Sequence, residues 1–206
     1  MRTKKLLFYL LAALLGGCVP SLHPLYTSQD ITYDEKLVGT WVGNDQKLVF
    51  EKLETRKFYD LTSAFEDKQG KFAAHLVKVD QMLFLDLFPK NPKLDDATDY
   101  YKSHLVRAHT FIKVEQIEPT LKLQAIDTEK LKTRLQNDPN LIKHEIVRGA
   151  LVLTASTKEL QEFMKKYAND PTLVSDPLEY KRAEAKEPDE GSEESGKSES
   201  AEAPEE

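Results

Sequence analysis

The feature that most restricts the fold of this chain is an alternation of apolar and polar residues that begins near residue 36 and recurs along most of the remaining sequence. Leu121 and Leu123, for example, alternate with Lys122 and Gln124. Such a period of two puts successive side chains on opposite faces of an extended chain and is typical of half-buried β-strands. The pattern predicts nine short strands, at residues 37–43, 46–52, 56–65, 71–79, 82–88, 104–116, 120–126, 143–148 and 150–155.

Two segments, 128–136 and 157–168, repeat their apolar positions at helical spacing instead. Ser156 followed by Glu159 forms the capping-box pattern at the start of the second segment. The longest irregular connection, 89–103, is the best candidate for a functional loop. Many short consecutive strands with only two short helices predict a mainly β fold, either an antiparallel up-and-down barrel or a strongly curved meander.

The N-terminus has the composition of a secretory signal peptide. Three basic residues lie within the first five positions, and ten apolar residues follow at 6–15. An apolar run of this length is typical of a signal peptide, whereas a helix that spans a bilayer needs about 20 residues. We therefore expect residues 1–17 to be removed from the mature protein.

The end of this segment, Leu15-Gly16-Gly17-Cys18, resembles the lipobox of bacterial prolipoproteins. The resemblance implies cleavage before Cys18, attachment of a diacylglyceryl group to its thiol, and acylation of its new amino group. Two or three acyl chains would anchor the protein stably in a bilayer. Because Val19 follows, the resemblance favours the periplasmic face of the outer membrane over the plasma membrane. Cys18 is the only cysteine of the chain, which excludes a disulfide framework.

Charge and composition divide the rest of the chain into three parts. Residues 18–35 contain two prolines and no periodicity, so we expect a lipid-anchored spacer, partly packed through Leu25 and Tyr26. Residues 36–182 form one β-rich domain. Residues 183–206 carry ten acidic side chains against two lysines and no large apolar side chain, which predicts a disordered acidic tail. The overall charge of −6 argues against a nucleic-acid partner, which would need a basic face.

The first predicted strand contains Gly39-Thr40-Trp41, with the only tryptophan of the chain. A Gly-x-Trp motif at this place resembles that of the calycins, which include the lipocalins and the fatty-acid-binding proteins. The resemblance implies a lipocalin-like barrel in which the tryptophan closes one end and a late basic residue stacks on its ring. Arg182 would be that partner, through a cation–π contact. The helix at 128–136 and the connection at 89–103 depart from the pattern of that family.

The mature chain as a whole also resembles a group of uncharacterised bacterial lipoproteins. The resemblance runs through the segments CVPSLHPLYT, LVGTW, AHLVKVDQMLFLDLFP, HTFIKV and LTASTKELQEFM. It covers nearly everything before the acidic tail. It implies a location in the cell envelope and no particular activity.

The sequence holds only weak candidates for catalytic chemistry. Asp86 interrupts an apolar strand, so its carboxylate is either catalytic or bonded to a neighbouring donor such as His75 or Arg107. His104 and His109 are five residues apart on a predicted strand, so they face opposite sides and cannot share a metal ion. No metal-binding or cofactor-binding motif occurs.

These observations leave two classes of function. In the first, the protein binds an apolar small molecule in the barrel mouth or an envelope protein on its surface, without catalysis. In the second, it is a hydrolase of unrecognised type that uses Asp86 and His75. An enclosed apolar pocket would favour the carrier, and a filled core with a polar cleft near these two residues would favour the hydrolase.

Overall fold

The computed structural model describes residues 18–53, 57–90, 94 and 96–183. The predicted signal peptide, with Leu15, Gly16 and Gly17 of the lipobox, lies outside the described residues. So does the predicted acidic tail from residue 184 onward.

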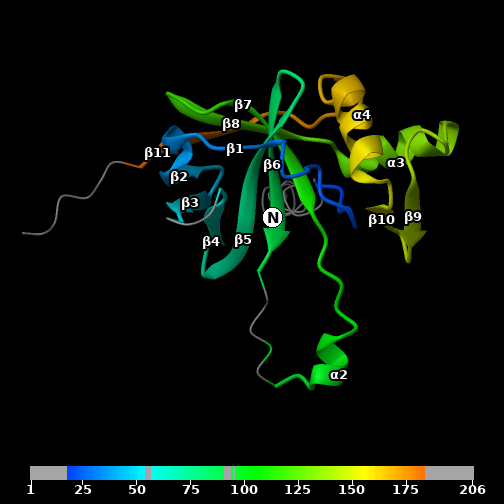
Figure 1. Cartoon of the computed structure of the whole chain (residues 1–206), viewed down its shortest axis with the longest axis horizontal. Coiled ribbons are helices and arrows are strands. Elements are labelled where there is room, and N and C mark those ends of the chain that lie inside the picture. Colours follow the sequence, from blue (N-terminus) through cyan, green and yellow to red (C-terminus); the bar gives the residue numbers. More distant parts are fainter. Residues whose placement is uncertain (1–17, 54–56, 91–93, 95, 184–206) are drawn as a thin grey trace, which may run out of the picture.

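Eight antiparallel strands close into a barrel (Figure 1). The strands are β2 (Gly39–Gly43), β3 (Gln46–Lys52), β4 (Tyr59–Phe65), β5 (Lys68–Val79), β6 (Met82–Pro89), β7 (Thr110–Gln116), β8 (Thr120–Ala125) and β11 (Leu178–Arg182). Strands β2 to β8 pair in chain order, and β11 closes the barrel by pairing with β8 on one side and β2 on the other. The prediction of a mainly β, lipocalin-like antiparallel barrel is therefore confirmed.

The strand that closes the barrel is one the sequence pattern does not reveal. In β11 only Leu178 and Tyr180 are apolar, and the strand is too short for the alternation to stand out. Two of the predicted strands lie outside the barrel instead: β9 (His144–Val147) and β10 (Ala150–Leu153) form a separate hairpin. The predicted strand 104–116 begins only at Thr110. The residues before it belong to the long connection between β6 and β7, residues 90–109, which we call the excursion.

Both predicted helices are present, as α3 (Thr128–Asn137) and α4 (Thr157–Tyr167). The Ser156–Glu159 capping box at the start of α4 is confirmed. A third helix, α2 (Asp99–Lys102), lies in the excursion between β6 and β7, and a 3₁₀ turn, η1 (Glu35–Leu37), precedes β2. Thr98 caps α2 by accepting a hydrogen bond from the backbone N–H of Tyr101.

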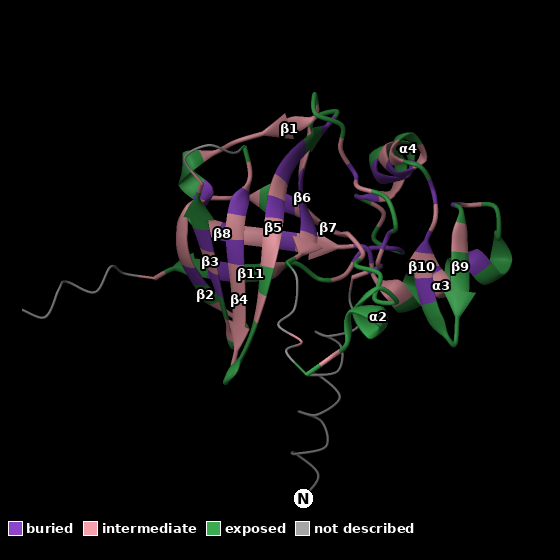
Figure 2. Ribbon diagram, turned by 60° about the horizontal axis from the view of Figure 1, so that its bottom comes forward, coloured by how far each residue is buried: buried purple, intermediate pink, exposed green. Residues whose placement is uncertain are grey.

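The described residues form two apolar cores. Figure 2 shows buried residues both along the barrel strands and on α4 and β10. Large side chains fill the inside of the barrel, and the bulkiest are at most 2% exposed: Trp41, Phe50, Tyr59 and Tyr180. The second core joins the outer face of β5, β6 and β7 to α3, α4 and β10. A sheet packed on both faces explains why β6 has an almost continuous apolar run.

Residues 18–35 are part of the folded domain, which corrects the expectation of a spacer. Val19, Ser21 and Leu25 are buried, and Leu25 belongs to the second core, as expected. Farther along, β1 (Ile31–Thr32) pairs with Leu76 and Val77 of β5, beyond the part of β5 that pairs with β4. The segment lacks periodicity because single backbone contacts, rather than a continuous strand, hold it on the domain.

Arg182 lies over Trp41, in the contact expected from the calycin resemblance. The two residues are opposite one another in the β11–β2 register, and the guanidinium carbon is 4.3 Å from the ring centroid. The guanidinium also donates to the carbonyl of Val38 at 2.8 Å, while the indole N–H donates to that of Leu37 at 2.9 Å. Gly39 has a φ of +126°, and a Cβ atom there would lie 2.6 Å from Arg182 Nη1. The glycine of the motif thus makes room for the arginine.

A double-mutant cycle between Trp41→Phe and Arg182→Ala should show a coupling free energy above about 0.5 kcal/mol. A cation–π stack of this kind contributes about 0.5–2 kcal/mol, depending on its exposure. The free energy of unfolding would be measured by urea titration. Lys181→Ala, at the exposed neighbouring position on β11, serves as the control and should be additive with Trp41→Phe. Additivity for Arg182 as well would contradict a closing role for the pair.

Candidate functional site

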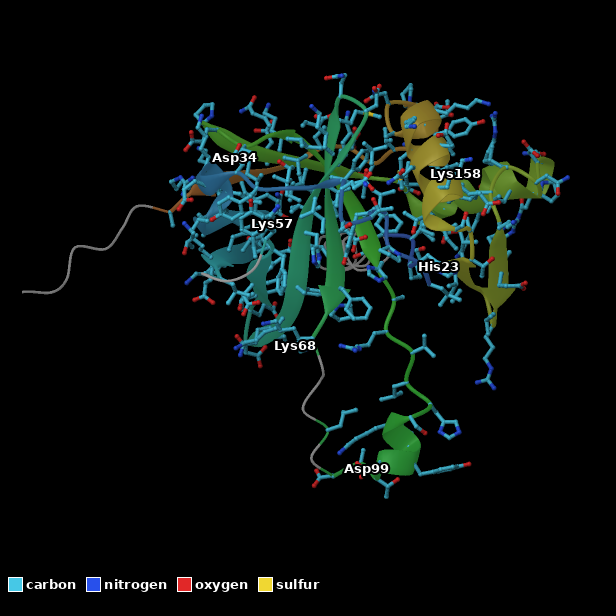
Figure 3. All side chains as sticks on the ribbon, in the orientation of Figure 1. His23, Asp34, Lys57, Lys68, Asp99 and Lys158 are labelled. Atoms are coloured by element: carbon cyan, nitrogen blue, oxygen red, sulfur yellow. The ribbon has the colours of Figure 1, made fainter. Side chains whose placement is uncertain are left out.

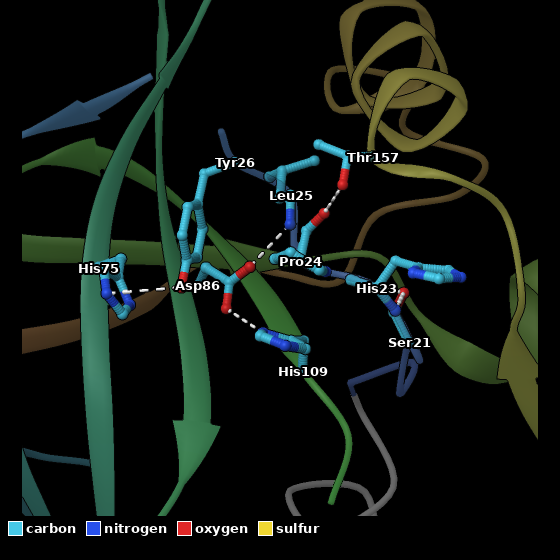
Figure 4. A network of polar contacts seen from close by, with 9 residues as sticks. All are labelled: Ser21, His23, Pro24, Leu25, Tyr26, His75, Asp86, His109 and Thr157. Atoms are coloured by element: carbon cyan, nitrogen blue, oxygen red, sulfur yellow. Dashed lines mark hydrogen bonds and ion pairs between the residues drawn. The ribbon is translucent and has the colours of Figure 1, made fainter. Parts of the chain in front are cut away.

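Asp86 lies on the outer face of the barrel, on β6, beneath the N-terminal segment (Figure 4). Its side chain is fully buried. One carboxylate oxygen accepts the backbone N–H of Leu25 at 2.8 Å, and the other is 2.7 Å from Nδ1 of His109. Both carboxylate oxygens therefore bond to groups of the chain itself.

The prediction that Asp86 bonds to His75 or Arg107 is wrong. His75 lies opposite Asp86 in the β5–β6 register, yet the side-chain bond of the carboxylate goes to His109. Arg107 instead donates to the carbonyl of Pro89 at 3.2 Å and stacks on Phe88, with the guanidinium carbon 4.6 Å from the ring centroid.

His75 is surrounded by aromatic rings. It stacks on Tyr26 with the ring centroids 4.4 Å apart, and it is 4.9 Å from the ring of Phe58. Its Nε2 is 3.4 Å from the Tyr26 hydroxyl, and its Nδ1 is buried with no hydrogen-bond partner in the described part of the chain. Burial lowers the pKa of His75 below its usual 6.5, and the negative charge of Asp86 only partly opposes this. The neutral imidazole is the form that this environment favours.

The contacts of this cluster hold the N-terminal segment on the barrel, through the bonds of Asp86 to Leu25 and His109. Among the described residues, no serine, threonine or cysteine side chain is hydrogen-bonded to His75 or His109. Nor does that part of the chain contain three His, Cys, Asp or Glu residues placed to hold a metal ion.

The N-terminal segment makes a second set of contacts, around Ser21. Ser21 and His109 exchange two backbone hydrogen bonds of 2.8 Å, at the start of β7. On its other side the segment bonds to Leu153 of β10, which donates to Pro20 and accepts from Leu22. Ser21 itself is fully buried. The segment thus lies between the barrel and the β9–β10 hairpin and is bonded to both.

Helix α4 adds side-chain contacts to the same segment. The hydroxyl of Thr157 donates to the carbonyl of Pro24 at 2.8 Å, and the Gln161 amide donates to that of Leu25 at 2.9 Å. Because Asp86 holds the other side of Leu25, this residue is fixed between the barrel and α4. In the sequence, Asp86 stands out as a charged residue within an apolar strand. Its partner at residue 25 is a backbone N–H, which no side-chain type indicates.

Two other histidines, His104 and His144, make their hydrogen bonds outside this cluster. His104 is exposed in the excursion, with Nδ1 2.7 Å from the carbonyl of Tyr100. It is not on a strand, so the expectation that it shares a strand with His109 is wrong. His144 lies at the start of β9, with Nδ1 2.9 Å from the carbonyl of Ile142.

An open groove of about 1120 Å³ runs between residues 139–145 and one face of α4. Its walls carry charges of both signs, including Lys158, Glu162 and Lys166, and the rings of Phe163 and Tyr167. Glu159 spans it to Lys143 at 2.8 Å. This ion pair and the helix cap at Ser156 lower the pKa of Glu159 from 4.5 to about 2. The sequence shows no sign of the groove, because its two walls, residues 139–145 and α4, face each other only once the β9–β10 hairpin between them has folded.

Comparisons of the chain with protein-family models, with curated proteins and with solved structures find no match. Within the described residues, no helix is both long enough and apolar enough to cross a bilayer. The candidate site therefore has to be interpreted from its own geometry.

Replacing Asp86 by Ala should lower the free energy of unfolding by about 2–4 kcal/mol, because it leaves the buried Leu25 N–H and His109 without their acceptor. Asp86→Asn keeps one acceptor oxygen and should cost about half as much. Urea titration measures both, and Asp176→Ala, at an exposed position, is the control. A loss below about 0.5 kcal/mol for Asp86→Ala would contradict the role of Asp86 in holding residue 25.

His75 should make the protein less stable as the pH falls from about 7 to 5. Its pKa is lower in the folded protein than the 6.5 of the unfolded chain, so the unfolded state takes up the proton first. Replacing His75 by Phe removes this titration and should flatten the fall in stability over that range. Urea titrations at pH 7.5, 6.5 and 5.5 provide the comparison, and equal slopes for both proteins would contradict it.

Proposed function

We propose that this protein is a lipid-anchored component of the bacterial cell envelope that binds an envelope protein through its surface and has no catalytic step. Its anchor is the acylated Cys18, and its place is the periplasmic face of the outer membrane in a host with two membranes. The observation that carries the choice of partner is the filled interior of the barrel.

A lipocalin-like barrel that carries an apolar ligand needs an internal cavity to hold it. Here the four largest aromatic side chains of the barrel core, Trp41, Phe50, Tyr59 and Tyr180, are at most 2% exposed. Leucines, together with Ala74 and Val114, make up the rest of this buried core. This packing supports a barrel that serves as a rigid support rather than as a container.

The groove beside α4 offers the alternative place for recognition. It is open, and it combines aromatic rings with charges of both signs, a combination that suits a polypeptide partner better than a lipid. Helix α4 also bonds to the N-terminal segment, so the groove is connected directly to the segment that carries the anchor.

The hydrolase has less support. Its proposed carboxylate, Asp86, has no exposed surface, and both of its oxygens bond to groups of the chain itself. His75 faces aromatic rings rather than an open cleft.

The anchor is tested by Cys18→Ser expressed in the native host. The variant should leave the membrane fraction, because the acyl chains are the only strong attachment that we propose. Mass spectrometry of the N-terminal peptide of the wild-type protein should find the acyl groups on Cys18. A variant that still sediments with membranes and resists salt extraction would contradict the proposal.

The partner is tested by extracting the wild-type protein from native membranes in mild detergent and measuring its mass by native mass spectrometry. We expect a complex with a second polypeptide and no retained lipid inside the barrel. Lys158→Glu together with Lys166→Glu, both in the groove, should abolish the complex. Lys47→Glu together with Lys68→Glu, exposed on the barrel, should not.

Three results would contradict this proposal: a stoichiometric apolar ligand bound to the protein, a protein that is monomeric in every preparation, or a complex that survives the groove substitutions.

A further inference from the structure

The exposed large apolar side chains of the described chain are concentrated in one region. Seven of the eight lie in the N-terminal segment, in the excursion between β6 and β7, or in the β9–β10 hairpin: Leu22, Tyr100, Tyr101, Leu105, Val106, Ile146 and Val147. The eighth, Val42, is on the barrel. Tyr100 and Val106 are the most exposed, at 79% and 77%. Four of them lie within seven residues of one projecting segment, 100–106, and exposed apolar side chains gathered in this way mark a surface that contacts something apolar.

The excursion and the hairpin project from the same side of the molecule. Figure 1 shows α2 and the turn of the β9–β10 hairpin both extending downward, and they lie on the lower side again in Figure 2. Figure 3 places Asp99, the first residue of α2, at the far end of the excursion. The groove beside α4 is lined by α4 and residues 139–145 and uses none of these apolar side chains.

The proposed acylation site lies at the base of both projections. Ser21, three residues after Cys18, is bonded through its backbone to His109, where the excursion returns to the barrel. Its neighbours Pro20 and Leu22 bond to Leu153 at the end of the hairpin. Cys18 is itself half-buried on the domain, and Val19 belongs to the second core. An acylated Cys18 would therefore hold the base of both projections near the bilayer surface.

We propose that the tip of the excursion, Tyr100, Tyr101, Leu105 and Val106, inserts into the interfacial layer of the bilayer that holds the acyl chains of Cys18. The neighbouring hairpin residues Ile146 and Val147 lie against the same surface. This inference rests on the proposed lipid anchor and adds that the bilayer is the partner of this apolar face.

The residue types of the tip suit a bilayer interface. Tyrosine is enriched there because its ring is apolar and its hydroxyl is polar. The formal charges of the described residues 96–107 cancel, with Asp96 and Asp99 against Lys102 and Arg107. Insertion should therefore depend on apolar burial and not on anionic lipids.

The test uses the mature chain, residues 18–206, with Cys18→Ser, which has neither acyl chains nor cysteine. A polarity-sensitive fluorophore is attached at Val106→Cys, with Val42→Cys on the barrel as the matched control position. On vesicles of phosphatidylethanolamine and phosphatidylglycerol at millimolar lipid, emission from position 106 should shift to the blue and rise about threefold. Emission from position 42 should not change. Vesicles of phosphatidylcholine should give the same result, because no net charge is involved.

Adding Tyr100→Ser and Tyr101→Ser to the labelled protein should lower its partition onto vesicles about tenfold, because two rings no longer leave water. Both side chains are exposed, so circular dichroism should be unchanged. Equal responses at positions 106 and 42, or none at either, would overturn the proposal. So would a probe at 106 that stays in water on pure lipid and is buried only on native membranes, since a protein would then cover this face.

Failure here can be distinguished from failure of the proposed function. The vesicle assay uses protein without acyl chains, so its result does not depend on whether Cys18 is modified. Release of Cys18→Ser from membranes in the native host tests the anchor separately.

Discussion

Four backbone hydrogen bonds around Ser21 connect the parts of this molecule. Two join Ser21 to His109 at the start of β7, and two join its neighbours to Leu153 of β10. The first pair attaches the N-terminal segment to the barrel and the second attaches it to the hairpin. Asp86 and α4 then fix Leu25, a few residues later. Without this segment the second core would lose Val19 and Leu25, which pack between the barrel and the helices.

The closure of the barrel determines which surfaces of the molecule are left for binding. Strand β11 removes the free edges of β2 and β8, and Arg182 covers Trp41 at that junction. Large aromatic side chains occupy the interior, so the outside of the barrel supplies the second core. Our proposed function therefore places recognition on the outer surfaces of the molecule. The groove beside α4 and the apolar excursion are two such surfaces.

The sequence predicts the barrel and both longer helices well, because alternation and helical spacing are local signals. The contact between Trp41 and Arg182 is also expected from the sequence, through the calycin resemblance. Strand β11 escapes detection because five residues with two apolar positions carry too little pattern. The packed N-terminal segment and the partners of Asp86 depend on contacts between groups distant in the chain, which no local pattern of side chains reveals. The groove has no signature in the sequence because its walls meet only in the folded chain, whereas the excursion is indicated by its irregularity.

The central claim is that the N-terminal segment belongs to the fold and so holds the apolar side of the domain on its membrane. Hydrogen exchange of the acylated protein in lipid nanodiscs, compared with the Cys18→Ser chain in solution, tests it most directly. Amides of residues 19–25 should be protected in both samples, while those of 99–107 should be protected only in nanodiscs. The β2–β3 turn should exchange equally in both. Rapid exchange of residues 19–25 in solution, or unchanged exchange of 99–107 on the membrane, would contradict the account.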